Sequence, residues 1–354
     1  MTSNSIPSHV HAVVDASYTG EAGGIAGKPA YRTVQAALNA APEAADRPHI
    51  IYIRSGAYYE KLTITKPNIM LLGQERDYTV LTYDAASGTL RPDGTAYGTT
   101  GSASLTVKAP QFTAANLTIA NGFDYPANLA KSEQDPDRIA HPQAVALKTE
   151  SGSDQAVFRN CRLEGYQDTL YTGAGRQYFD HCIISGHIDF IFGAGQAVFQ
   201  SCEMICRARN GEEIEGYITA PSTKLSEEYG LVLIDCRLVK DSPALPDECY
   251  SLGRPWHPTT DLPDGTRAAD PEAVGAAVYI RCYMDAHIAR EGWHSMAGRD
   301  KHGETVWFQP QDSRFFEFGS YGPGAHRHEN RRQLNEADLQ RFTLARIFDG
   351  WEPA

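Results

Sequence analysis

FRNCRL (158–163), FDHCII (179–184) and FQSCEM (199–204) are three copies of one short pattern, and this pattern indicates the fold class. Each copy has an aromatic residue, two variable residues, a cysteine, one more variable residue and an aliphatic residue or methionine. Successive cysteines lie 21 and 20 residues apart. A repeat of this period in β-rich segments is typical of a parallel β-solenoid, whose coils stack at the strand spacing of about 4.8 Å.

The pattern continues toward the C-terminus as LIDCRL (233–238) and YIRCYM (279–284), so five of the seven cysteines share one phase. The later intervals of 34 and 46 residues suggest one coil with an insertion and about two coils. FTAANL (112–117) is an earlier, degenerate copy. A leucine-rich repeat has a similar period, but its Leu-x-x-Leu-x-Leu signature is absent. Chance similarity among β-hairpins is the remaining alternative.

Both ends of the chain differ from the repeat. After an N-terminal segment (1–30), residues 31–41 place apolar side chains at helical spacing and stop at Pro42, which predicts a short capping helix. At the other end, residues 335–349 predict a helix that begins at an Asn cap and ends before a glycine. The expected fold class is therefore all-β, a single solenoid domain over 1–354 with a helix at each end.

Composition and charge exclude several classes of protein. The chain has 354 residues, with 32 basic and 44 acidic side chains, and a net charge of −12 argues against nucleic-acid binding. No apolar run approaches the roughly 18 residues of a membrane span. Residues 1–8 are polar and do not resemble a secretory signal, so we expect either a cytosolic protein or a mature chain with an added Met1.

The phase of the repeat relates two distant aspartates. Asp168 and Asp189 each lie seven residues after a repeat cysteine, so they occupy equal positions on adjacent coils. Two carboxyl groups this close do not both ionise easily, and one pKa should rise. The result is a site in which one carboxyl group can donate a proton and the other, charged, can act as a nucleophile. The alternative is a pair of turn aspartates on a solvated edge.

Five further motifs are distributed over much of the chain. In order they are GAYYE (56–60), QAVAL (143–147), GYQDTLY (165–171), DFIFG (189–193) and LGRPW (252–256). With them the sequence resembles the pectin methylesterases, especially the bacterial secreted type. The resemblance implies a right-handed parallel β-helix, a monomer outside the cell, and no cofactor or metal. It also implies hydrolysis of the C6 methyl esters of homogalacturonan, the galacturonate polymer of pectin, to free carboxylates and methanol.

The resemblance assigns a role to each polar residue of these motifs. Asp189 corresponds to the nucleophile and Asp168 to the general acid that later acts as base. Gln143 and Gln167 correspond to the donors to the oxyanion, and Arg254 to the cation that keeps the nucleophile charged. These assignments agree with the chemistry, because a carboxylate is a weak nucleophile that must be held ionised and aimed.

A sugar polymer also needs aromatic and apolar contacts along a groove. The residues expected to contact the substrate are Trp256, Phe192, Tyr171, Trp293, Met296 and Thr99. Trp293 and Met296 lie outside the motifs, and packing is an equal alternative for both. Long loops rich in Pro, Gly and Asp are expected to wall the groove.

The cysteine ladder allows a disulfide, because stacked positions fall within the Cα range that a disulfide requires. On spacing alone Cys182 has either Cys161 or Cys202 as its partner, and the bacterial relatives suggest Cys182 with Cys202. The alternative is a ladder of buried free thiols. The spacings do not suggest zinc ligands.

Four other functions agree less well with these residues. A pectate lyase needs clustered carboxylates for calcium, and a polygalacturonase has a Gly-His-Gly motif that residues 186–188 do not match. A serine esterase needs a Gly-x-Ser-x-Gly elbow, which the chain lacks. A solenoid that only binds polysaccharide would not need the complete set of aspartates, glutamine and arginine.

Overall fold

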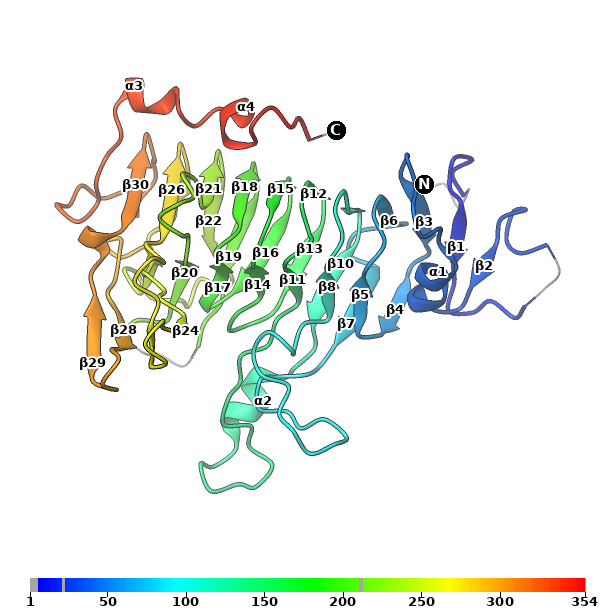
Figure 1. The fold of residues 1–354 in the computed structure, drawn as a ribbon, viewed down its shortest axis with the longest axis horizontal. Helices are drawn as coiled ribbons and strands as arrows, with labels where there is room; N and C mark the ends of the chain where they lie inside the picture. The colour runs from blue at the N-terminus through cyan, green and yellow to red at the C-terminus, as the bar shows by residue number, and fades with distance from the viewer. Residues whose placement is uncertain (1–5, 21–22, 210–212, 354) are drawn as a thin grey trace.

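The computed structural model describes residues 6–20, 23–209 and 213–353, and its strands form one right-handed parallel β-helix (Figure 1). Three long sheets run along the helix axis. The eleven-stranded sheet contains, in spatial order, β2 (Ala30–Tyr31), β1 (Ala12–Val14), β3 (His49–Ile53), β6 (Ile69–Gly73), β9 (Thr113–Ala115), β12 (Ala156–Arg159), β15 (Arg176–Asp180), β18 (Gln196–Gln200), β21 (Leu231–Ile234), β26 (Ala276–Ile280) and β30 (Arg314–Phe318).

The two other long sheets complete each coil. The eight-stranded sheet contains β27 (Tyr283–Met284), β22 (Arg237–Lys240), β19 (Glu203–Cys206), β16 (Ile183–Gly186), β13 (Arg162–Glu164), β10 (Thr118–Asn121), β7 (Thr79–Tyr83) and β4 (Gly56–Tyr59). The seven-stranded sheet contains β23 (Tyr250–Gly253), β20 (Gly216–Pro221), β17 (Ile188–Gly193), β14 (Leu170–Thr172), β11 (Leu147–Thr149), β8 (Leu105–Val107) and β5 (Leu62–Ile64).

The repeat pattern defines the register of the eleven-stranded sheet, as its period indicated. The aromatic position of each copy pairs with the next, from Phe158 to Phe179 and Phe199. Two details of the expectation were wrong. The interval of 46 residues is a single coil with a long insertion, because β21 pairs directly with β26. The degenerate copy is displaced by two residues, since Ala114 and not Phe112 pairs with Phe158.

A left-handed backbone residue turns the chain at each copy of the repeat. The residue before each repeat cysteine has a positive φ, at Asn160 (47°), His181 (52°), Ser201 (53°), Asp235 (53°) and Arg281 (52°). This conformation is unfavourable for L-residues by roughly 1–2 kcal/mol. This turn is retained because the strands before and after it are held in their sheets. The turn directs the following cysteine into the core.

The repeat cysteines form a ladder of free thiols, and the expected disulfide between Cys182 and Cys202 is not found in this structure. All seven cysteines of the chain are buried and unpaired. The thiol of Cys182 donates to Phe158 O at 3.3 Å, and that of Cys202 donates to Phe179 O at 3.4 Å. In-register stacking gives each sulfur the same orientation toward the preceding coil, whereas a disulfide needs two side chains turned toward each other with a dihedral near 90°.

The helices are shorter than the sequence predicted. The N-terminal helix α1 spans Val34–Ala40, and Tyr31 belongs to a strand instead. Thr33 caps α1, while Glu60 of the GAYYE motif accepts hydrogen bonds from the first two helical N–H groups. No described helix is long and apolar enough to cross a membrane.

The predicted C-terminal helix is two short helices, α3 (Glu336–Leu339) and α4 (Leu344–Ile347). Asn335 does form the expected cap, in a capping box with Asp338. The chain leaves the helical path after α3 because it follows the surface of the solenoid (Figure 1). The outer face of the eleven-stranded sheet presents an apolar row there, and the C-terminal segment covers it with Ile347 and Phe348.

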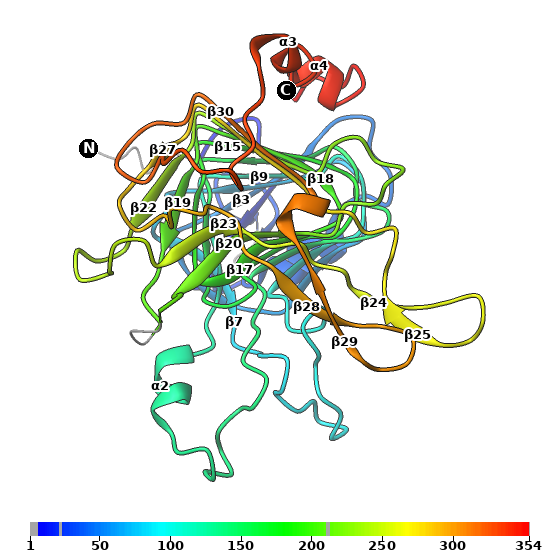
Figure 2. The ribbon, with the colours of Figure 1, turned by 90° about the vertical axis from the view of Figure 1, so that its left-hand side faces the viewer.

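Insertions project from the side of the solenoid on which β17 and β20 lie (Figure 2). One insertion carries α2 (Tyr125–Ala130), and another follows β7. Two antiparallel hairpins, β24 (Thr259–Asp261) with β25 (Arg267–Ala269) and β28 (Met296–Arg299) with β29 (Thr305–Phe308), stand near the C-terminal end, where a 3-10 turn (Pro310–Asp312) leads into the last strand. The seven-stranded sheet is thus the floor between these projections.

Candidate active site

The two aspartates lie at the start of neighbouring strands of the seven-stranded sheet. Tyr171 pairs with Phe192 across β14 and β17, so Asp168 and Asp189 occupy equal positions on adjacent coils, as the repeat predicted. Both have a left-handed backbone, with φ of 66° and 50°. The N–H of Asp168 donates to Ile188 O at 3.0 Å, which fixes the two segments side by side. The strained backbone at both positions indicates a geometry that the surrounding sheet imposes.

Asp189 is held by Arg254 in an ion pair with two hydrogen bonds. The Nε and one terminal nitrogen of Arg254 donate to the two carboxylate oxygens at 2.8 and 2.7 Å. The side chains are only 20% and 10% exposed, so water screens the pair weakly. Burial by itself lowers the pKa of Arg254, but the charge and hydrogen bonds of Asp189 outweigh it and raise this pKa. Arg254 is therefore a firmly held cation, and it binds Asp189 at two points.

Asp168 has the opposite environment. It is buried, and no described basic side chain forms an ion pair with it. Burial raises the pKa of Asp168 well above its ordinary value, and the negative charge of Asp189 raises it further, while Arg254 lowers it by less. The site thus contains one carboxyl group that is paired with a cation and one whose proton is held more tightly than usual, and such a difference suits acid–base chemistry.

Arg254 reaches Asp189 because the chain passes very close to the neighbouring strand. Gly253 precedes Arg254, and a Cβ at Gly253 would lie 2.2 Å from Thr219 Oγ1. The N–H of Arg254 donates to Thr219 O at 3.0 Å. The glycine of the LGRPW motif is therefore required by this approach, and it places the arginine on the coil beside the two aspartates.

Gln143 and Gln167 lie on neighbouring coils just before β11 and β14. The N–H of Ala144 donates to Gln167 O at 3.1 Å, which brings the two glutamine segments together. Oε1 of Gln143 is buried and has no hydrogen-bond partner among the described residues. An unsatisfied buried amide oxygen is costly and rare in native proteins, so this position is marked as unusual.

Three of the expected aromatic residues meet beside the aspartates. The ring centroids of Tyr171 and Phe192 are 4.7 Å apart, and Trp256 lies 5.6 Å from Phe192. These rings form one cluster with the small side chains Ala103 and Val145. The cluster provides an apolar floor next to the ionised carboxylate.

The other three candidate contact residues have different positions. Trp293 is only 3% exposed and stacks on Phe315 at 4.4 Å, so it is a packing residue and the expected substrate contact is not supported. Met296 is half-buried at the start of the β28–β29 hairpin. Thr99 is half-buried in the insertion after β7, with its Oγ1 3.5 Å from Ser87 Oγ.

Tyr217 is part of the site and was not anticipated. It lies on β20, where it pairs with Ile188, and the guanidinium carbon of Arg254 stands 3.9 Å from the centroid of its ring. No motif marks this residue in the sequence. Only the strand register, which pairs Tyr217 with the residue before Asp189, identifies it.

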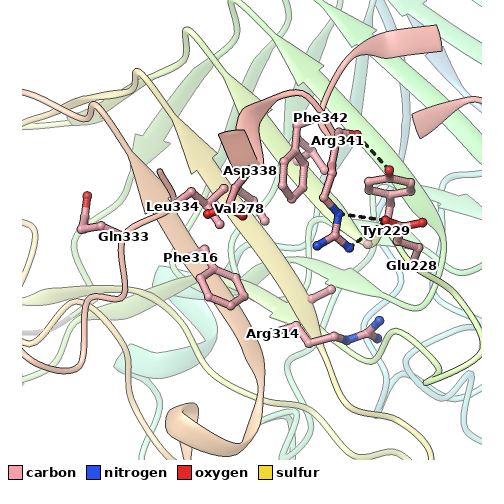
Figure 3. Close-up of a pocket in the computed structure, with 13 residues that line it drawn as sticks. Glu228, Tyr229, Val278, Arg314, Phe316, Gln333, Leu334, Asp338, Arg341 and Phe342 are labelled. Carbon is pink, nitrogen blue, oxygen red and sulfur yellow. Dashed lines mark hydrogen bonds and ion pairs between the residues drawn. The ribbon is translucent and has the colours of Figure 1, made fainter. Parts of the chain in front are cut away.

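A cavity of about 320 Å³ lies elsewhere, beneath the C-terminal segment (Figure 3). Its floor is formed by Val278 and Phe316 on the outer face of the eleven-stranded sheet, and Leu334 and Phe342 cover it. Arg341 closes one side through an ion pair with Glu228, which Figure 3 marks with dashed lines. This cavity is on a different sheet from the aspartates and is separate from the candidate active site.

Comparison with known proteins identifies the family and the fold. The Pectinesterase family model matches residues 24–350. Pectinesterase A of Dickeya chrysanthemi is 46% identical over 326 residues, which cover 91% of this chain and 88% of that protein. The pectin methylesterase from Yersinia enterocolitica has a TM-score of 0.88 and 50% identity, over 91% of this chain and 99% of that one.

A third similar structure is a pectin methylesterase in complex with a hexasaccharide. It has a TM-score of 0.92 and 43% identity, covering 98% of this chain and 99% of that chain. The resemblance read from the motifs is therefore confirmed, as are the right-handed parallel β-helix and the class of enzyme. The chain belongs to the pectinesterase family, and its activity is the hydrolysis of carboxylic esters in pectin.

Proposed function

We propose that Asp189 is the nucleophile and Asp168 the proton donor in the removal of methyl groups from galacturonate C6 esters. The observation that carries this proposal is the ion pair of Arg254 with Asp189 beside Asp168, whose pKa burial and the neighbouring charge raise. One carboxylate is held charged and aimed, while its neighbour keeps a proton for the leaving group.

In the first half of the reaction, an oxygen of Asp189 attacks the ester carbonyl carbon. The carbonyl oxygen becomes negative, and the side-chain amides of Gln143 and Gln167 donate hydrogen bonds to it. The bond between the carbonyl carbon and the methoxy oxygen then breaks. The Asp168 proton passes to that oxygen, methanol leaves, and an anhydride joins Asp189 to C6.

In the second half, Asp168 is ionised and acts as a base. It takes one proton from a water molecule while the remaining hydroxide attacks C6 of the anhydride. The bond from C6 to the Asp189 oxygen breaks, which leaves a free carboxyl group on the galacturonate residue of the polymer and restores the Asp189 carboxylate. Asp168 regains its proton, so both groups are ready for another cycle.

The substrate proposed for this site is a methylated homogalacturonan chain. The apolar rings of Phe192 and Trp256 suit a methyl ester and a sugar face, and they lie beside the ionised carboxylate. We also propose that the enzyme acts as a monomer outside the cell, where a polymer of this size is found. Cell fractionation and gel filtration test these two points directly.

Methanol release from methylated pectin tests the catalytic assignment. We expect Asp189→Asn to lower kcat by at least about a thousandfold. Arg254→Lys should lower kcat far more than it raises KM, because the lysine keeps the charge but not the two-point contact with the nucleophile. Asp180→Asn is the matched control, since Asp180 is on the same coil but in the eleven-stranded sheet.

Two results would contradict the proposal. Full activity of Asp189→Asn would remove the nucleophile. A new double-bond absorbance without methanol from the unmodified enzyme would indicate a lyase instead.

A further inference from the structure

The backbone of Asp189 lies where the regular pairing of strands is interrupted. β17 pairs with β20 at Ile188 and again at Ile191, opposite Tyr217 and Thr219, so a step of three residues on β17 matches a step of two on β20. Asp189 is inside this bulge and has a φ of 50°. Bulges re-aim side chains, and a left-handed backbone is unfavourable for an L-residue. Contacts outside the ladder must therefore hold Asp189 in its conformation.

His187 makes such contacts with the peptide groups before Asp189. The N–H of Ile188 donates to His187 Nδ1 at 2.7 Å. The N–H of His187 donates to Tyr166 O at 3.0 Å, and its carbonyl oxygen accepts from the N–H of Tyr217 at 2.9 Å. One residue is thus bonded to the coils on both sides, and its side chain orients the peptide that leads to Asp189.

The imidazole of His187 is buried and uncharged. The side chain is fully buried, and burial together with the charges of Arg209 and Arg207 lowers the pKa of His187 to about 3. At neutral pH the ring therefore has one nitrogen that accepts and one that carries a proton. Nδ1 is the acceptor, because the N–H of Ile188 points at it. A doubly protonated ring would have no acceptor for that N–H.

The insertion that carries α2 braces the same region (Figure 2). Tyr125 of α2 meets the His187 ring edge-on with centroids 4.4 Å apart, and it stacks on Tyr166 at 5.5 Å. Tyr166 lies two residues before Asp168, and His187 lies two residues before Asp189. A single tyrosine of the insertion thus packs against the segments that lead to both aspartates.

We propose that His187 is a positioning residue whose Nδ1 atom holds the Ile188 N–H and thereby keeps the carboxylate of Asp189 aimed at the ester. This inference rests on the proposed function, because it takes Asp189 as the nucleophile. Without the acceptor, the peptide is free to rotate toward an ordinary strand conformation, which turns the carboxylate away from Arg254. The sugar-binding surface does not change, so the loss falls on kcat and not on KM.

Methanol release from methylated pectin, measured at steady state, compares two substitutions of His187. His187→Leu removes the acceptor, and we expect kcat to fall by roughly tenfold to a hundredfold with little change in KM. His187→Asn also loses the ring but keeps an acceptor oxygen near the position of Nδ1, so it should recover most of kcat. Neither variant keeps the ring contact with Tyr125, so their difference isolates the hydrogen bond.

His287→Leu is the matched control. His287 is also fully buried and meets a tyrosine, Tyr250, edge-on at 5.6 Å. Neither of its ring nitrogens has a hydrogen-bond partner among the described residues. We expect His287→Leu to lower the unfolding temperature and to leave kcat per folded molecule unchanged.

Four results overturn the inference: unchanged kcat in His187→Leu, an equal loss in His187→Asn, a change confined to KM, or an equal fall of kcat in His287→Leu. Asp189→Asn in the same assay separates the two levels of the argument. If Asp189→Asn is inactive and His187→Leu is fully active, only the role of His187 is refuted. If Asp189→Asn is active, the proposed function itself is refuted.

A second measurement covers the case in which His187→Leu does not fold. NMR of isotope-labelled histidine nitrogens in the unmodified enzyme reports which ring nitrogen carries the proton, and the His187 signal is identified by its absence in His187→Asn. We expect the proton on Nε2 at neutral pH, with Nδ1 unprotonated. A proton on Nδ1 overturns the inference, because that nitrogen then cannot accept from Ile188.

Discussion

The guanidinium carbon of Arg254 lies 3.9 Å from the centroid of the Tyr217 ring. The same guanidinium donates to both oxygens of Asp189, so the tyrosine ring and the carboxylate contact one cation. A face-on cation contributes about 0.5–2 kcal/mol depending on how far it is desolvated. Tyr217 itself contacts His294 edge-on at 5.4 Å, which holds the ring in place.

This contact makes Tyr217 a positioning residue, and two variants test that role. Tyr217→Phe keeps the ring and should retain most of kcat. Tyr217→Leu removes the aromatic face, and we expect kcat to fall by roughly tenfold with little change in KM, because Arg254 then holds Asp189 less rigidly. Steady-state methanol release gives both constants. A loss of equal size in the phenylalanine variant, or a change in KM alone, would show that the ring does not act through Arg254.

Asp168 makes stability depend on pH in a defined direction. Its pKa in the folded protein is raised by burial and by Asp189, so the folded state holds this proton more tightly than the unfolded chain does. This contribution to the free energy of unfolding is fully present below the pKa of an ordinary aspartate and is lost as pH rises through the raised value. Asp168→Asn, which stays neutral, should therefore become more stable than the unmodified enzyme as pH increases.

Denaturant unfolding of both proteins at several pH values measures this difference. Asp46→Asn is the control, because Asp46 is exposed in a loop. If the stability difference between Asp168→Asn and the unmodified enzyme is the same at acid and alkaline pH, Asp168 is not protonated in the folded site.

The C-terminal segment is held to the solenoid by a few buried side chains. Phe348 is fully buried against the outer face of the eleven-stranded sheet, and Arg176 donates to Phe348 O at 2.7 Å. Phe348→Ala should cost about 3–5 kcal/mol of local stability. We expect faster proteolysis of residues 335–353 with unchanged kcat per folded molecule, since the catalytic residues lie on another sheet.

Trp351→Ala is the matched variant for this segment, because Trp351 is only half-buried and should have a smaller effect. A fall in kcat in Phe348→Ala without any change in proteolysis would mean that the C-terminal segment communicates with the active site.

The period of the cysteine pattern predicts the stack of coils because each turn must return one aromatic residue to the same place in the core. The same period is enough to place Asp168 against Asp189, since both follow the ladder by a fixed number of residues. Arg254 is different, because a long insertion separates it from the preceding coil, and only the family resemblance related it to Asp189. Tyr217 was missed because its partner comes from another coil, and such a contact follows from a strand register that no local pattern encodes.

The last prediction concerns redox conditions and follows from the seven buried thiols. Each repeat cysteine packs as a small apolar group and donates to a carbonyl of the preceding coil, as Cys202 does to Phe179 O. The unfolding temperature should therefore be the same with and without a reducing agent, and titration in denaturant should count seven free thiols. Cys202→Ala should lower the free energy of unfolding by about 1 kcal/mol, the size of an ordinary core truncation of one atom. A count of five thiols in the unreduced protein would instead mean that a disulfide forms, and the in-register orientation of the ladder would have to change to allow it.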